Sequence, residues 1–142
     1  TMNSIDETIT CLKVINDYDM PVWVSFVLLD DKHILSGELL EDAIKEIEKF
    51  DIDVLLLNCN PVNRTKTALK TLNNHWNKRW GIYPNLGIGE PNPDGIIDNI
   101  YSDEDFMNLI KNSVSLGASI LGGCCGSSPK HIQLIKNYLL EH

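Results

Sequence analysis

Residues 53–60 read DVLLLNCN, and this stretch decides the predicted fold. Its first apolar residues, 54–57, run without a polar break, which is typical of a strand covered on both faces of a parallel sheet. The run ends in Asn58, Cys59 and Asn60, so polar residues follow directly where the strand ends. In parallel α/β folds, the residues that bind ligands gather at this carboxyl end of the strands.

The same alternation of buried strand and amphipathic helix extends to both sides of this stretch. Strands are predicted at 22–29, 53–60, 79–85 and 117–123, and helices at 4–15, 38–50, 61–72, 102–114 and 129–139. One helix followed by four strand–helix units implies a parallel α/β sheet. Four units form either a small open sheet or half of a (β/α)8 barrel, which has about 250 residues in full.

Composition and charge exclude several classes of protein. Apolar residues make up 43% of the 142 residues, which predicts one folded domain with a real core. The chain has 20 acidic and 12 basic residues and a net charge of -8, so nucleic acid and anionic membranes are not expected as partners. No apolar run approaches the ~20 residues that span a bilayer, and no signal-peptide pattern opens the sequence. We therefore expect a cytoplasmic protein.

The two ends of the sequence suggest where the domain lies. The last three residues, Leu140, Glu141 and His142, are similar to the start of an expression tag, so the domain is expected to span residues 1–139. The sequence begins at Thr1, and no strand is predicted before the first helix. This suggests a sequence that starts within a larger fold.

Three of the four cysteines follow predicted strands. Cys59 ends the second strand, and Cys124 and Cys125 follow the fourth within GGCCG, whereas Cys11 lies in the first predicted helix. Thiolates are strong zinc ligands, and three protein ligands leave one tetrahedral position open. The residues alone leave two interpretations open: a three-thiolate zinc site, or small residues packed separately at strand ends. A redox pair is disfavoured because the chain lacks Cys-x-x-Cys.

Four segments, in this order, resemble the C-terminal half of the homocysteine S-methyltransferase family. They are PVWVSFVLLDDKHILSGELLEDAI (21–44), LLLNCNP (55–61), YPNLG (83–87) and GASILGGCCGSSPKHI (117–132). The family includes the homocysteine-binding module of cobalamin-dependent methionine synthase, and betaine- and S-methylmethionine-dependent enzymes. The resemblance implies a TIM (β/α)8 barrel, with this chain supplying its C-terminal half.

The resemblance also implies a catalytic zinc site. The family's zinc ligands match Cys59, Cys124 and Cys125, and the Asn of the YPN motif, which can occupy the fourth zinc position before homocysteine arrives, matches Asn85. Asn58 and Tyr83 are expected beside the metal or the substrate. The implied reaction, a step of methionine biosynthesis, transfers a methyl group from an unidentified donor to the zinc-bound thiolate of homocysteine, forming methionine.

The sequence departs from the family in what it lacks. The family's barrel begins with strands that are absent here, including a Gly-rich loop that helps to recognise the amino acid, so an incomplete site is expected. The loop 86–94 is expected to border the mouth of the site. A half barrel leaves two sheet edges open, which predicts self-association or pairing with the N-terminal half. The alternative function is a non-catalytic zinc-binding or assembly module derived from this fold.

Three histidines lie near these segments without a clear role in the chemistry. His33 is interpreted as a surface-loop residue near the mouth, and His75 as a residue at a helix end that packs on the barrel. His131 is interpreted as a helix-surface or cap residue, because the thiolates already provide three zinc ligands.

Overall fold

The structure is a computed structural model that describes residues 1–15, 17–89, 92–97 and 99–141. In chain order its elements are α1 (Ile5–Ile15), β1 (Trp23–Phe26), α2 (Leu40–Ile47), β2 (Val54–Pro61), α3 (Val62–His75), β3 (Arg79–Asn85), α4 (Asp103–Ser115), β4 (Ile120–Leu121) and α5 (Pro129–Glu141). One helix followed by four strand–helix units is the order predicted from the sequence. Residues 90–91 of the predicted mouth loop, and His142, lie outside the described residues.

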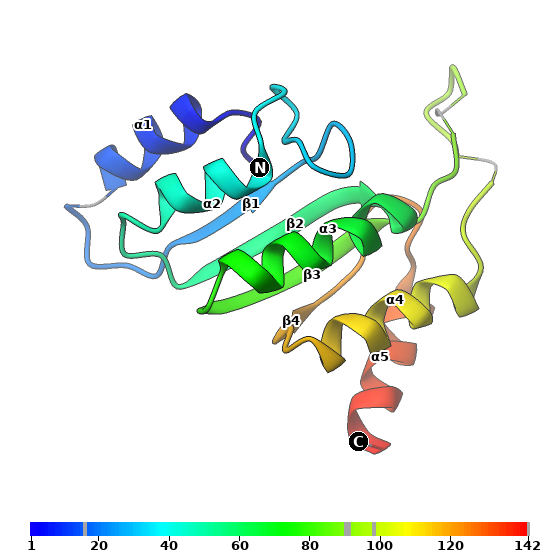
Figure 1. Ribbon diagram of the computed structural model, residues 1–142. Helices are drawn as coiled ribbons and strands as arrows, with labels where there is room; N and C mark the ends of the chain where they lie inside the picture. The colour runs from blue at the N-terminus through cyan, green and yellow to red at the C-terminus, as the bar shows by residue number, and fades with distance from the viewer. Residues whose placement is uncertain (16, 90–91, 98, 142) are drawn as a thin grey trace.

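The four strands form one parallel sheet in the order β1-β2-β3-β4. Each strand pairs with the next one along the chain, as successive βα units of a barrel do. Figure 1 shows helices α1 to α4 in front of one face of the sheet, with α5 beside α4 near the end of the chain. This arrangement is the predicted half of a (β/α)8 barrel.

The core lies between the sheet and the helices. Alternate residues of β1 and β2 face the helices and are almost fully buried together with helix residues: Val24, Phe26, Leu55, Leu57, Leu40, Ile44, Leu69, Leu72, Phe106 and Ile110. On the other face of β2, Leu56 is also only 5% exposed. Burial on both faces explains why the run at 54–57 has no polar residue.

Strand β1 is shorter than predicted because, after Phe26, its backbone bonds to the side chain of Asn60 instead of to the backbone of β2. The structure ends β1 at Phe26 rather than at residue 29. Beyond that point, the backbone N–H of Leu28 donates to Oδ1 of Asn60 at 2.6 Å, and Leu29 N–H donates to the carbonyl of His33 at 2.9 Å. The chain therefore leaves the sheet into a loop. β4 is also short, at two residues.

Met2 lies beside β1 in the position of a neighbouring strand. Its N–H donates to Ser25 O at 2.7 Å, its carbonyl accepts from Val27 N–H at 3.4 Å, and it forms a parallel bridge with Phe26. No strand was predicted before α1, and the structure assigns none, but the backbone at Met2 already pairs with the edge of the sheet.

In the part of the chain that the structure describes, no helix is long and apolar enough to cross a membrane.

Candidate metal centre

Three sulfur atoms converge where β2 and β4 end. Cys59 lies near the end of β2, and Cys124 and Cys125 follow β4. The Sγ atoms of Cys59 and Cys125 are 3.6 Å apart, those of Cys124 and Cys125 are 3.9 Å apart, and all three lie within 4.8 Å of one another. The structure thus brings together the three cysteines that the sequence singled out.

These distances fit a zinc ion. Zinc bonds to sulfur at about 2.3 Å, so tetrahedral geometry places two sulfur ligands about 3.8 Å apart. Two of the three Sγ–Sγ separations, 3.6 and 3.9 Å, lie on either side of that value, and the third is at most 4.8 Å. Sulfur ligands also favour zinc over magnesium or calcium, which prefer oxygen. Three such ligands leave the fourth tetrahedral position open.

The backbone of Cys59 departs from regular strand geometry. In a regular strand Cys59 would share the face of Leu55 and Leu57, which pack against the helices. Its φ of 55°, the only positive value at a non-glycine residue within the described ranges, breaks this alternation. The pairing of β2 with β3 shifts register between Asn58 and Pro61, at the same place. A left-handed residue costs about 1–2 kcal/mol, so the surrounding contacts must hold it.

The side chain of Asn60 supplies part of that support. It is fully buried; its Oδ1 accepts the Leu28 N–H and its Nδ2 donates to Phe26 O at 3.2 Å. The Thr65 hydroxyl donates to the Asn60 carbonyl at 3.1 Å. These bonds fix the chain immediately after Cys59. No role was predicted for Asn60 from the sequence, although a buried strand that ends in asparagine, cysteine and asparagine was the available signal.

The loop with the adjacent cysteines is held by the end of β3. Cys124 N–H donates to Pro84 O at 2.9 Å, and Leu86 N–H donates to Cys125 O at 2.8 Å. The Ser127 hydroxyl donates to Cys124 O at 2.6 Å. Gly126 has φ +74°, and a Cβ there would lie 3.3 Å from the nitrogen of Gly87, so glycine suits both the turn and the close approach.

Burial and neighbouring thiols govern the protonation of Cys59. Burial, followed by hydrogen bonds with Cys124 and Cys125, raises the pKa of the Cys59 thiol to about 12. Negative charge on neighbouring sulfur atoms disfavours the Cys59 thiolate, so Cys59 retains its proton in the metal-free chain. A bound cation offsets this effect, because metal binding favours the deprotonated thiol.

The other predicted site residues lie at the same end of the sheet. Asn85 ends β3, and its Oδ1 accepts the Gly87 N–H at 2.7 Å. Asn58 and Tyr83 are paired in the β2–β3 register. The amide nitrogen of Asn58 donates to Oγ1 of Thr1 at 2.9 Å, whereas its Oδ1 is buried with no hydrogen-bond partner among the described residues.

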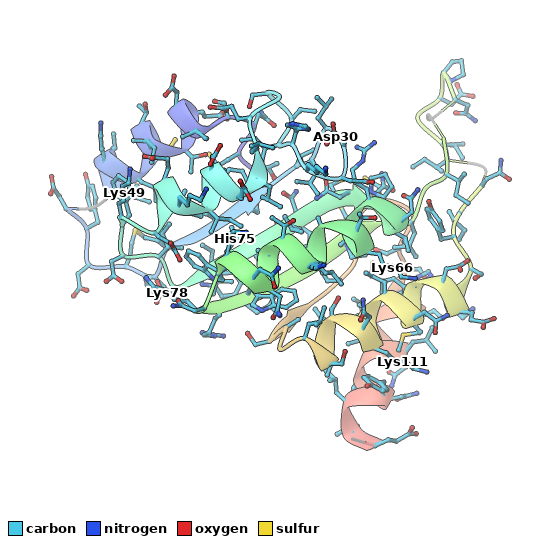
Figure 2. All side chains as sticks on the ribbon, viewed as in Figure 1. Asp30, Lys49, Lys66, His75, Lys78 and Lys111 are labelled. Atoms are coloured by element: carbon cyan, nitrogen blue, oxygen red, sulfur yellow. The ribbon has the colours of Figure 1, made fainter. Side chains whose placement is uncertain are left out.

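His33 and His75 lie at opposite ends of the sheet. Nδ1 of His33 lies 2.8 Å from Oδ1 of Asp30, in the loop after β1. His75 ends α3, where its Nε2 lies 3.6 Å from Glu41 Oε2. Figure 2 shows Asp30 toward the end to which β2 points and His75 at the other end. His75 is therefore far from the thiols.

His131 does not lie on a helix surface. Its exposed fraction is only 3%, so the prediction of a helix-surface residue was wrong. The prediction of a cap residue was right, because Nδ1 of His131 accepts the backbone N–H of Ser128 at 3.0 Å. Phe106 of α4 covers the imidazole ring, and sequence periodicity gave no indication of this contact.

Comparison with known proteins decides the family. Residues 1–139 match the sequence profile of the family described as homocysteine S-methyltransferase. The chain belongs to the homocysteine S-methyltransferase family. Homocysteine S-methyltransferase 2 of Arabidopsis thaliana is 27% identical over 88% of this chain and 38% of its own length. Selenocysteine methyltransferase of Astragalus bisulcatus is 30% identical over 84% of this chain and 36% of its own length.

Solved structures of this family share the fold. The oxidized form of the homocysteine methyltransferase MmuM from Escherichia coli superimposes with a TM-score of 0.80 at 22% identity, over 96% of this chain and 43% of that chain. Its metallated form gives a TM-score of 0.77 at 22% identity, over 96% and 42%. The sequence thus spans about two fifths of the proteins that it matches, which agrees with the predicted half barrel.

Proposed function

We propose that this chain provides the zinc-binding half of an enzyme that transfers a methyl group to the thiol of homocysteine and forms methionine. The observation that carries the proposal is the cluster of three thiols, all within 4.8 Å, where the strands of a half barrel end. Membership of the homocysteine S-methyltransferase family supports the reaction class. The methyl donor is left open.

The thiol cluster suits this reaction. A free thiol, with a pKa near 8.5, is mostly protonated at neutral pH, and a zinc ion bound here supplies the positive charge that keeps a substrate thiol in its nucleophilic thiolate form. Cys59, Cys124 and Cys125 would hold the ion and leave one position for the substrate sulfur. These electron-rich sulfur ligands would preserve the nucleophilicity of that substrate sulfur.

Three neighbouring side chains are proposed to line the substrate position. Asn85, at the end of β3, would lie beside the fourth zinc position before homocysteine binds. Asn58 offers a buried Oδ1 that has no partner among the described residues and would accept a hydrogen bond from a donor group of the substrate or from water. Tyr83 lies opposite Asn58 in the sheet and would border the same space.

Metal analysis tests the site. We expect about one zinc per chain in the purified protein, and we expect Cys59→Ser and Cys124→Ser to lose it because each removes one of three protein ligands. Cys11→Ser is the matched control: this cysteine lies on α1, outside the cluster, and its loss should leave the zinc content unchanged. A metal-free protein with intact free thiols would reject the zinc site.

A methylation assay separates catalysis from metal binding alone. It requires the complete barrel, with homocysteine as acceptor and methylcobalamin, betaine or S-methylmethionine as alternative donors. Methionine formation that depends on Cys59 supports the enzyme. Stoichiometric zinc without methyl transfer from any donor favours the alternative, a non-catalytic zinc-binding or assembly module. Selenocysteine is a useful second acceptor because two relatives are named for methylating it.

A further inference from the structure

A buried histidine joins the first turns of two neighbouring helices. His131 lies in the first turn of α5, and its Nδ1 accepts the N–H of Ser128 at 3.0 Å and lies 3.1 Å from Oγ of the same residue. Its Nε2 lies 3.4 Å from Oδ1 of Asp103, the first residue of α4. Phe106 meets the ring edge to face at a centroid distance of 5.3 Å.

The hydrogen bonds orient the imidazole ring. Because Nδ1 accepts a backbone N–H, the neutral ring carries its proton on Nε2, which faces Asp103. Lys130 forms an ion pair with the same carboxylate, and its hydrogen bond lowers the pKa of Asp103. In the described part of the chain, Nε2 has no partner with full hydrogen-bond geometry. Asp103 is thus the charge toward which the buried Nε2–H points.

This contact is close in sequence to the zinc-binding cysteines. Ser128, which His131 holds, is three residues after Cys125. The intervening Ser127 donates both its N–H, at 3.1 Å, and its hydroxyl, at 2.6 Å, to the carbonyl of Cys124. A shift of Ser128 relative to α4 would therefore be transmitted to the backbone of the cysteine pair.

A second connection runs from α4 to the same loop. Tyr101 N–H, two residues before α4, donates to Leu86 O at 2.8 Å, and Leu86 N–H donates to Cys125 O at 2.8 Å. The cysteine loop is thus held between the start of α4 on one side and the start of α5 on the other. His131 is the buried side chain that connects the start of α5 to the start of α4.

We propose that His131 is a positioning residue that fixes Ser128 against α4 and thereby keeps Cys124 and Cys125 within reach of Cys59. The effect of His131 on zinc affinity rests on the proposed zinc site. The fixing of the loop, however, is a property of the metal-free chain and is tested separately.

Amide hydrogen exchange of the metal-free chain tests the loop. His131→Ala should speed exchange at Cys124 N–H and Leu86 N–H by about tenfold, since it leaves the Ser128 N–H without its buried acceptor. The amide of Leu57 in β2 should be unaffected, which shows that the fold is intact. His131→Asn should restore slow exchange, because a carboxamide oxygen can accept the same N–H.

Cobalt(II) binding, read from the sulfur-to-cobalt charge-transfer absorption, tests the link to the metal. His131→Ala should weaken Co²⁺ binding by about tenfold, as the loss of a residue that orients metal ligands does. Asp103→Asn should weaken it by a smaller factor. Glu104→Gln is the matched control, since it removes a carboxylate from the same first turn of α4 and should not change the affinity.

The outcomes distinguish the two proposals. Wild-type exchange at Cys124 and Leu86 in a folded His131→Ala protein would overturn the positioning role. Where that variant does not fold, Asp103→Asn decides, and exchange at the two amides identical to that of Glu104→Gln would overturn it. Absence of Co²⁺ binding by the wild type, together with faster loop exchange in the variants, would reject the zinc site and leave the positioning role intact.

Discussion

The sulfur atoms of Cys59 and Cys125 lie 3.6 Å apart although the two residues are 66 positions apart in the chain. Two features of the structure produce this contact. Strand β3 lies between β2 and β4; its residue Pro84, and Leu86 just after it, hold the cysteine loop. The left-handed backbone of Cys59 then breaks the strand alternation that would direct it toward the helices.

The left-handed conformation of Cys59 should reverse the usual effect of glycine on the stability of a strand. Glycine in a strand normally makes a protein less stable to unfolding than alanine at the same position, by about 0.5–1 kcal/mol. At Cys59, where φ is 55°, we expect the reverse: Cys59→Gly should be more stable than Cys59→Ala by about 1 kcal/mol, because only glycine adopts this region without strain. Urea unfolding of the metal-free variants measures the difference.

Ser25 provides the control for that comparison. It lies in the regular strand β1, so Ser25→Gly should be less stable than Ser25→Ala. A Cys59→Gly protein that is less stable than Cys59→Ala would show that strain at this residue does not limit stability.

A close approach of two strands makes Gly81 a sensitive position. A Cβ at Gly81 would overlap the carbonyl of Ile120 and lie 2.6 Å from its Cβ. Gly81→Ala should therefore destabilise the chain by about 1–3 kcal/mol and displace β4. Because β4 leads into the cysteine pair, zinc affinity should fall as well. Urea unfolding and zinc titration measure the two effects, and Ser119→Ala, beside β4, is the control.

The carboxylate of Asp30 should contribute stability that depends on pH. It accepts the N–H groups of Lys32 and His33 at 2.8 and 2.9 Å. Its bond with the Lys32 N–H, followed by that with the His33 side chain, lowers the pKa of Asp30 to about 2. A lowered folded-state pKa gives stability that is present above the unfolded value of 3.8 and is lost as the pH falls toward 2.

Substitution of Asp30 tests this pH dependence. The wild type should be more stable than Asp30→Asn at pH 5, and the difference in urea midpoint should shrink as the pH falls below 4. Asp31→Asn, which removes the neighbouring carboxylate of the same loop, is the control. A difference between the wild type and Asp30→Asn that is constant with pH would contradict the assignment.

The open edges of the half barrel predict self-association of the isolated chain. Trp23 on the edge strand β1 is 54% exposed. Burying such side chains is favourable, so we expect dimers or larger species at micromolar concentration. Light scattering after size exclusion measures the mass. Trp23→Lys should shift the population toward monomer, whereas Ile96→Lys, an exposed control in a loop, should not.

A clean wild-type monomer at that concentration would contradict self-association. In that case the exposed edges would be available only to the remaining half of a complete barrel. Mixing the chain with such an N-terminal half, expressed separately, would then be expected to yield a 1:1 complex.

The order of elements was predictable because it depends on local patterns. The apolar run at 54–57 needed no partner to be identified as a buried strand, and the amphipathic stripes of the helices were equally local. The ends of the strands were not predictable in this way. β1 stops at Phe26 because the Asn60 side chain binds Leu28 N–H, a contact between residues that are distant in sequence.

The sequence by itself determined the alternating parallel fold, the family and the choice of Cys59, Cys124 and Cys125, because hydrophobic periodicity and short motifs are written in neighbouring residues. Only the tertiary structure decided how the thiols meet. The left-handed backbone of Cys59 and the buried contact of His131 with α4 arise from packing between segments that are far apart in the chain. Such contacts have no local pattern, since their energy depends on which surfaces the fold brings together.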